Sequence, residues 1–447
     1  MRSLFCLSVL MGMALGAPLA TTYLVLPDGT GDFPTIQAAV DATLPGDLIL
    51  LANGTFVGPG NRDIDFNGKD LEVRSQSEDP TRCIIDCGSS GLVHHRGFFF
   101  HNGESPAAGV EGVTIANGGV ADYGGGIAIE FYSSPTIANC VIRDCSAGYA
   151  GGGISCRESC DPIVIGCVFR NNQTNEPADD IIAHGGGMYC GHYCDVVLSG
   201  CTFAANRANL RGGGFHCHVY STALLTNCTF YRNTSLNGAN IDVRYASNVT
   251  LDHSISVFGE AGSGLNCEAG CDAQVLCSDV YGNYGGDWVG CLEDQAGQNG
   301  NLWADPLLCD PANGDFHLAE DSPCGPAGQP CGLIGAWPVG CARADVLVDA
   351  PSTRRLDLER VQPNPFASTV TLTYRVPAGA AGQVFLEIHD AAGRLVRRLT
   401  SGASSEGRHE IVWNGCDPTG RPVSAGAYFV TLNADRATVR RRILLVR

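Results

Sequence analysis

The chain has 447 residues, more than one ordinary globular domain holds, so either several domains or a repeat array is expected. With 28 Lys and Arg against 46 Asp and Glu, its net charge of −18 argues against non-specific binding to nucleic acid or to anionic membranes. The 22 cysteines indicate an oxidising or extracellular setting, and 58 glycines without a collagen period indicate many tight turns.

The first twenty residues have the pattern of a secretory signal. A basic start at Met1-Arg2 precedes an apolar run from Leu4 to Leu15, and small residues follow up to Ala20. The run is too short to span a bilayer, and no other stretch is predicted to be a transmembrane segment. Residues 1–20 are therefore predicted to be a signal peptide, and the mature protein is expected to be secreted or held at the cell surface.

Residues 34–43 predict a short amphipathic helix with Pro34 near its start. Beyond it, two columns of residues recur in step. One is a glycine triplet followed by an apolar residue, and the other is a small residue flanked by apolar ones. The apolar members of the first column are Ile127, Ile154, Met188, Phe215, Ile241 and Leu265. The small members of the second are Cys140, Cys167, Cys201, Cys228, Ser254 and Ser278. Both columns advance by 27, 34, 27, 26 and 24 residues, which indicates a structural repeat.

Each repeat contains short β-rich runs broken by Gly and Asn, without helical periodicity. Such strands satisfy their backbone by pairing with the same strand of the next coil, so residues 21–342 predict a right-handed parallel β-helix with an N-terminal cap. Two apolar ladders are expected. The first is Ile137, Val164, Leu198, Leu225, Leu251 and Val275; the second is Ile142, Phe169, Phe203, Phe230, Ser256 and Val280. Asn172, Asn206, Asn233 and Asn283 are expected to form a stacked turn with a left-handed backbone.

Two segments resemble known β-helix families. The run from Asp28 to Asp41 resembles the capped N-terminus of the pectate-lyase-like and pectinesterase superfamily of right-handed β-helices. The Gly-Gly-Gly-Ile and Phe-x-x-Asn pair, as at Phe169 to Asn172, looks like chlamydial polymorphic outer-membrane repeats. The resemblance implies the fold over about residues 25–340. It does not imply one function, because this fold hosts lyases, hydrolases, esterases, adhesins and scaffolds.

Residues 343–361 lack Gly and Cys and predict a linker. From 362 to 447 longer alternating strands predict a small Ig-like β-sandwich. The segments Pro363 to Phe366, Asp390 to Arg394 and Trp413 to Tyr428 resemble the flagellar hook-cap-type Ig-like domain and the C-terminal sorting domain of type IX secretion cargo. That resemblance implies a sorting or anchoring role and contact with secretion machinery.

The 34-residue step places a seven-residue insertion near 173–183, and insertions in solenoids form loops on one face. Asp179, Asp180 and His184 are the candidate catalytic residues, and Glu176, Asp179 and Asp180 are the candidate ligands for calcium, the one cofactor considered. The plain alternative is a solvated acidic loop.

Histidines and cysteines gather in the same coils, as at His184, His192, His216 and His218 with Cys190, Cys194 and Cys217. One interpretation is a transition-metal site. The alternative is structural, because Cys-x₃-Cys recurs at 156/160, 190/194 and 267/271 and indicates disulfides across a bend or stacked thiols. Cys291, Cys309, Cys324, Cys331 and Cys341 are expected to staple the last coils.

The sequence favours a non-catalytic surface protein that binds a polysaccharide or a cell-surface partner. The second hypothesis is a polysaccharide lyase or glycoside hydrolase with its groove near residues 173–184. A lyase needs basic side chains that neutralise a uronate, and no Lys/Arg cluster surrounds the single lysine, Lys69.

Overall fold

The computed structural model describes residues 20–90, 93–174, 183–327, 330–342, 357–364, 366–376, 383–390, 394–403, 407–434 and 437–446. The chain divides into two compact units, Met1–Ala344 and Asp345–Arg447. Within the described ranges, no helix has both the length and the apolar character that crossing a membrane requires. The predicted signal peptide lies outside them, apart from Ala20.

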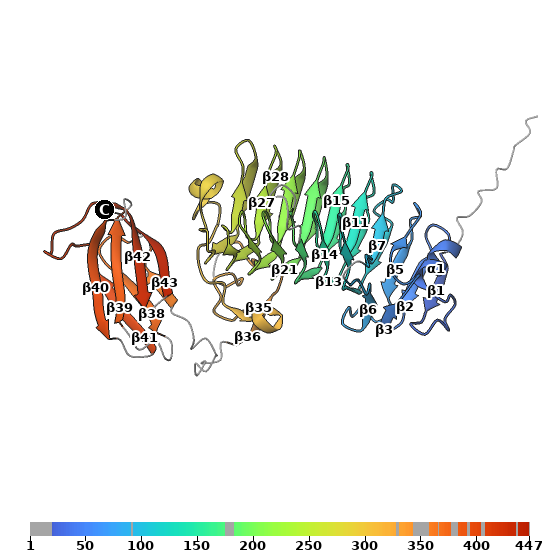
Figure 1. The fold of residues 1–447 in the computed structure, drawn as a ribbon, viewed down its shortest axis with the longest axis horizontal. Helices are drawn as coiled ribbons and strands as arrows, with labels where there is room; N and C mark the ends of the chain where they lie inside the picture. The colour runs from blue at the N-terminus through green and yellow to red at the C-terminus, as the bar shows by residue number, and fades with distance from the viewer. Residues whose placement is uncertain are drawn as a thin grey trace, which may run out of the picture. The chain divides into compact units, whose positions relative to one another are not determined.

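The first unit is a parallel β-helix of about nine turns, seen in Figure 1 as a row of stacked coils. From Phe98 to Ala261 each coil contributes one strand to each of sheets 1 to 4 in that order, whereas the coils before and after this range contribute none to sheet 4. Sheet 1 contains β4 (Ile64–Asp65), β7 (Phe98–Phe100), β11 (Ile127–Glu130), β15 (Ile154–Arg157), β19 (Met188–Gly191), β23 (Phe215–His218), β27 (Ile241–Val243) and β31 (Leu265–Cys267). Sheet 2 contains β1 (Thr22–Val25), β2 (Leu48–Leu51), β5 (Glu72–Ser75), β8 (Gly109–Glu111), β12 (Thr136–Ala138), β16 (Ile163–Ile165), β20 (Asp195–Ser199), β24 (Thr222–Thr226), β28 (Asn248–Asp252) and β32 (Asp272–Leu276).

The remaining strands of the solenoid form sheets 3 and 4. Sheet 3 contains β3 (Gly54–Val57), β6 (Cys83–Asp86), β9 (Thr114–Ala116), β13 (Val141–Arg143), β17 (Val168–Arg170), β21 (Thr202–Ala204), β25 (Thr229–Tyr231), β29 (Ile255–Val257) and β33 (Asp279–Tyr281). Sheet 4 contains β10 (Gly119–Val120), β14 (Ser146–Ala147), β18 (Gln173–Thr174), β22 (Arg207–Ala208), β26 (Thr234–Ser235) and β30 (Glu260–Ala261). The predicted fold class, an all-β chain with a parallel β-helix followed by a small sandwich, is confirmed.

The strand register confirms both predicted ladders. Ile137 pairs with Val164 and Val164 with Leu198, and the series continues to Val275. In the second ladder the rings of Phe169 and Phe203 stack with centroids 4.3 Å apart, and Phe203 and Phe230 stack at 4.7 Å. Side chains of similar size and polarity therefore occupy the same place in the core of each successive coil. This stacking buries apolar area without a change of register.

The small Cys/Ser column forms hydrogen bonds at the turn between sheets 2 and 3. The backbone N–H of Cys140 donates to Cys167 Sγ over 3.4 Å, and that of Cys228 donates to Ser254 Oγ over 2.9 Å. Cys167 Sγ in turn donates to the Ile137 carbonyl one coil earlier. The column thus supplies partners for backbone groups that the turn removes from the strand ladder.

The asparagine column is a stacked turn, but its predicted backbone is wrong by one residue. Positive φ belongs to the preceding residues, for example Ala205 at 55° before Asn206 and Arg232 at 51° before Asn233. The asparagines themselves are buried, and each side chain links coils: Asn206 Oδ1 accepts from the Asn172 N–H at 3.0 Å, and Asn206 Nδ2 donates to the Phe169 carbonyl at 3.0 Å. Hydrogen bonding inside the coil, rather than tolerance of a left-handed backbone, explains the asparagines.

Both ends of the solenoid are covered. The predicted N-terminal helix is α1 (Ile36–Ala42), capped by Thr35, with Ile36 and Val40 buried against the first coil (Figure 1). At the other end lie η1 (Gly290–Gln295), β34 (Leu308–Asp310), η2 (Pro311–Asn313), β35 (Asp315–Ala319) and β36 (Val339–Cys341). Disulfides Cys267–Cys291, Cys277–Cys331 and Cys309–Cys341 staple this segment as expected, whereas Cys324 is a buried free thiol.

The second unit consists of a three-stranded and a four-stranded antiparallel sheet. Its strands are β37 (Asp357–Gln362), β38 (Val370–Val376), β39 (Gln383–Asp390), β40 (Leu395–Ala403), β41 (Gly407–Trp413), β42 (Gly426–Ala434) and β43 (Ala437–Leu445). Trp413 of one sheet packs edge-on against Tyr428 of the other, with ring centroids 5.3 Å apart. Strand β37 occupies the end of the predicted linker, because Leu358 is buried in the sandwich core.

Replacing Asn206 with Ala is expected to destabilise the β-helix by roughly 2 to 4 kcal/mol, because it leaves the Asn172 N–H and the Phe169 carbonyl without buried partners. Urea unfolding of the full chain measures this loss. Asn248→Ala, at an exposed strand position, is the control and should change the unfolding free energy little. Equal losses in the two variants would contradict the proposed role of the column.

Candidate functional site

The predicted site residues fall partly outside the described chain. Glu176, Asp179 and Asp180 lie in residues 175–182, so their placement as catalytic or calcium-binding side chains stays a prediction. His184 is described. It forms parallel bridges with Ala150 and Arg211 in the neighbouring coils, beside the outer face of sheet 1.

The outer face of sheet 1 carries a network of polar and aromatic side chains. Since successive strand residues point to opposite faces, the inward Met188 and Cys190 leave Tyr189 outside, and the inward Phe215 and Cys217 leave His216 and His218 outside. We call this set the outer polar face. It comprises Tyr123, Glu130, Arg157, His184, Tyr189, His216, His218, Asp242 and Arg244.

At its centre, His216 and Asp242 lie side by side in adjacent strands. His216 Nδ1 is 3.1 Å from Asp242 Oδ2, and both side chains are fully buried. Burial raises the pKa of Asp242, but the close contact with His216 and the charge of Arg244 outweigh burial and hold this pKa below its usual value. Among the described residues, neither ring nitrogen of His216 makes a hydrogen bond of good geometry, although Nδ1 lies within ion-pair distance of Asp242. A carboxylate that orients an imidazole is one half of an acid–base arrangement.

Two further imidazoles, those of His184 and His218, lie beside this pair. The ring centroids of His184 and His216 are 4.8 Å apart, and those of His216 and His218 are 5.2 Å apart. His218 Nδ1 lies 3.1 Å from the Tyr189 hydroxyl. Burial, reinforced by the neighbouring His216, His184, His192 and Arg211, lowers the pKa of His218 to about 3. His218 is therefore neutral at ordinary pH.

The arginines of the outer polar face are already paired. Arg157 lies 2.9 Å from Glu130 and stacks over the Tyr123 ring at 3.8 Å, while Arg244 contacts Asp242 at 3.2 Å. Paired guanidinium groups have less charge to offer a uronate carboxylate, since an internal acid already compensates them. The face therefore resembles a buried structural network more than an anion-binding groove.

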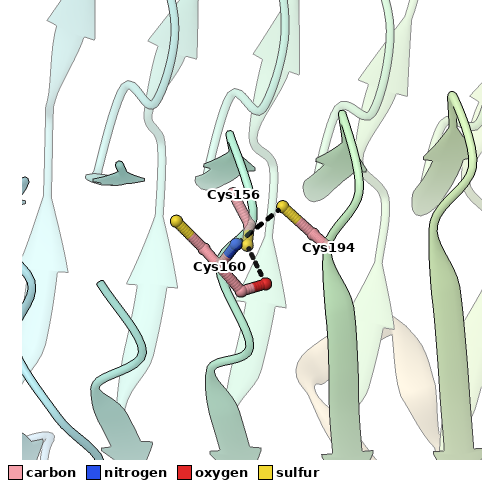
Figure 2. A group of neighbouring side chains, drawn as sticks. All are labelled: Cys156, Cys160 and Cys194. Carbon is pink, nitrogen blue, oxygen red and sulfur yellow. Dashed lines mark hydrogen bonds between the residues drawn. The ribbon is translucent and has the colours of Figure 1, made fainter. Parts of the chain in front are cut away.

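The histidines and cysteines that the sequence grouped together separate onto two sides of sheet 1. The histidines lie outside, whereas Cys190, Cys194 and Cys217 are buried in the core. Cys-x₃-Cys pairs 156/160 and 190/194 are free thiols, which matches the stacked-thiol interpretation. Within the described ranges, one set of three side chains is close enough to hold a metal ion: Cys156, Cys160 and Cys194, with sulfurs within 4.8 Å of one another (Figure 2).

The turn between sheets 1 and 2 exposes an aromatic column that our sequence reasoning missed. Each of five coils places two consecutive residues in the left-handed region, and four of the five pairs include an exposed aromatic ring. We call this set the aromatic corner. Its pairs are Phe131 and Tyr132, Glu158 and Ser159, His192 and Tyr193, Val219 and Tyr220, and Tyr245 and Ala246. The signal was present, because these pairs keep the spacing of the glycine column.

Comparison with known proteins covers only the second unit. Residues 362–438 match the family model of the FlgD Ig-like domain. No curated protein and no solved structure matches the chain. The match therefore relates residues 362–438 to a known domain family, and the description of the β-helix depends on its geometry alone.

His218→Gln is expected to remove part of the acid sensitivity of the fold. Because the folded pKa of His218 lies near 3 and the free value near 6.5, the unfolded chain alone gains this proton as the pH falls from about 6.5 toward 3. Stability is thus lost in this window, by roughly 1 kcal/mol between pH 7 and pH 5 after allowance for solvent screening.

Urea midpoints at pH 7 and pH 5 test this expectation, with the more exposed His317→Gln as the control. A drop in midpoint between the two pH values that is as large in His218→Gln as in the unchanged chain would show that His218 is not the sensitive group.

Proposed function

We propose that this protein is an exported β-helix protein that binds polysaccharide at the aromatic corner without turning it over. The observation that carries the proposal is the backbone strain there. Tyr132, Tyr193 and Tyr220 have φ of 65°, 66° and 54°, where Gly or Asn is more easily accommodated. Each tyrosine with this left-handed backbone lowers the free energy of unfolding by about 1 kcal/mol or more relative to glycine. The protein therefore keeps these aromatic rings at the expense of stability.

The rings are also highly exposed. Tyr132 is 74% exposed and Tyr193 is 60% exposed, whereas the core aromatic rings are fully buried. Exposed aromatic rings in a regular array mark interaction surfaces, and flat rings pack well against the apolar faces of sugars. Fold stability alone gives no reason to expose them.

The arrangement suggests where a sugar ring binds. Tyr193 stacks on Tyr220 at 5.5 Å, and among the described residues its other face meets no ring, because Ser159 occupies the matching place in the preceding coil. Tyr132 lies one coil further on. Two coil steps separate Tyr132 from Tyr193 by about 10 Å, which leaves room for one pyranose ring between them.

Charge favours a neutral polysaccharide. The chain has a net charge of −18, so a polyuronate meets long-range repulsion. Exposed aromatic rings recognise a neutral sugar without a counter-charge, and the paired arginines of the outer polar face offer little attraction to an acidic one.

Export agrees with the chemistry of the chain. Three disulfides near the end of the solenoid suit an oxidising compartment, and residues 1–20 have the pattern of a signal peptide. In this proposal the C-terminal FlgD-like domain sorts or anchors the protein and contacts the secretion machinery. The mature protein is then secreted or held at the cell surface.

A second candidate is catalysis on a polysaccharide, as a lyase or a glycoside hydrolase. The buried His216–Asp242 pair favours it, and the ring centroid of His184 lies 4.8 Å from that of His216. Asp179 and Asp180 precede His184 in the chain and stay candidates from the sequence alone. Against it stands the complete burial of His216, which keeps a polymer from its imidazole. Binding without turnover is therefore preferred.

Ser159→Tyr is expected to weaken binding to microcrystalline cellulose, a neutral β-linked glucan, at least tenfold, or about 1.4 kcal/mol. The added ring fills the place between Tyr132 and Tyr193. Folding should be unaffected, since three other coils carry tyrosine at this position. Pull-down isotherms of the full chain measure the affinity, and Tyr193→Ala should lower it similarly.

Tyr284→Ala removes an even more exposed tyrosine outside the aromatic corner and should leave binding unchanged. Retention of full affinity in both Ser159→Tyr and Tyr193→Ala would refute the corner as the binding site.

The full chain is expected to release neither reducing ends nor unsaturated uronates from neutral or acidic polysaccharides, with or without Ca²⁺. Turnover on any of them, abolished by His216→Asn, would instead establish the catalytic candidate.

A further inference from the structure

Three thiols converge on the inner side of the turn that carries the aromatic corner. Cys156 ends the inward row of β15, Cys160 follows the turn in the same coil, and Cys194 occupies the place of Cys160 in the next coil (Figure 2). Their sulfurs lie within 4.8 Å of one another, and all three side chains are fully buried. No other trio of metal-ligating side chains in the described chain converges in this way.

The three sulfurs bond to the backbone of the turn in different ways. Cys194 Sγ accepts the backbone N–H of Cys160 at 3.3 Å, and its own thiol donates to the Gly191 carbonyl at 3.1 Å. The Cys156 thiol donates to the Cys160 carbonyl at 3.4 Å, and the Cys160 thiol donates to the Arg157 carbonyl at 2.9 Å. Each thiol therefore has a backbone acceptor that holds its sulfur in place beside the other two.

The fold does not require sulfur at these positions. Ser221 and Ser247 continue the column of Cys160 and Cys194, and the Ser247 hydroxyl accepts the same backbone hydrogen bond at 3.1 Å. Cys156 likewise lies in a column with Ile129 and Val243. In other coils, serine or aliphatic side chains thus fill the same positions. The three thiols lie together where the column of Cys156 approaches the column of Cys160 and Cys194.

The number and type of the ligand atoms limit which metal ion fits this group. Three sulfur ligands in an apolar core suit a soft cation, and a monovalent one leaves less buried charge than a divalent one. Zinc in structural sites takes four ligands, and the group offers three. The histidines of sheet 1 lie on its opposite face and cannot complete the set.

We propose that Cys156, Cys160 and Cys194 bind one Cu(I) ion through three sulfur atoms. Copper enters as Cu(I) and stays Cu(I). A copper–sulfur bond forms at Cys194, the thiol proton released there passes to solvent, and the other two sulfurs complete the coordination. The site is independent of polysaccharide binding, because its side chains point into the core and not toward the corner surface.

The test uses the full chain, purified under reducing, oxygen-free conditions and then freed of reductant. Cu(I) is added together with bathocuproine disulfonate, a coloured Cu(I) chelator that competes for the metal. The expected result is one copper retained per chain, with an all-sulfur first coordination shell in X-ray absorption. Retention of no copper, or nitrogen or oxygen in that shell, would overturn the proposal.

Two variants borrow residues from sister coils, so each is expected to fold. Cys194→Ser copies Ser221, and Cys156→Val copies Val243; each should lose the retained copper. Cys201→Ser is the matched control, because it changes a buried thiol in the Cys/Ser column and should keep the metal. Thermal unfolding verifies that all three fold.

Copper that persists in a folded Cys194→Ser or Cys156→Val variant rules the site out. So does peptide mapping of the air-exposed wild-type chain, if it finds two of the three cysteines joined as a disulfide.

Discussion

The backbone of each coil depends on its neighbours for hydrogen bonds, and the rest of this structure follows from that dependence. A solenoid strand has no partner within its own coil, so strands pair in exact register across sheets of six to ten strands. Turns interrupt this pairing and leave N–H and carbonyl groups inside. The Cys/Ser and asparagine columns supply the missing partners from side chains, which explains why small polar residues recur at fixed places in a core that is otherwise apolar.

Fixed register also determines what the surface offers. A residue type repeated at one place of the coil becomes a continuous row along the solenoid, as with the tyrosines of the aromatic corner. The same turn presents those rings outside and the thiol group inside, since its left-handed residues carry the exposed rings and the cysteines that flank it are buried. A single turn geometry thus supports an external surface and an internal cluster that work by different chemistry.

The sequence predicted the periodic features well and the local ones poorly. The ladders from Ile137 and Ile142 were predictable because chain position alone determines stacking once the period is known. Asn206 was assigned the wrong role, since the preference of Asn for left-handed backbone resembles its preference for buried turn hydrogen bonds. The grouping of His216 with Cys217 failed because neighbouring residues of a strand face opposite ways. The pairing of His216 with Asp242 was missed although the register predicts it, since each directly follows a member of the column of Phe215 and Ile241.

The hydrogen bonds from turn N–H groups to the side-chain columns all run in one direction along the solenoid, and this direction affects how such a chain can lengthen during evolution. Each turn N–H finds its acceptor in the following coil, so a coil is complete only when the next one is present. Duplication of one whole coil keeps an acceptor for every turn N–H group, whereas loss of part of a coil leaves several N–H groups without acceptors at once. The solenoid is therefore lengthened by whole coils, each adding about 4.8 Å to the tyrosine row. A family of such proteins would differ in reach along a polymer while keeping the same contact at each step.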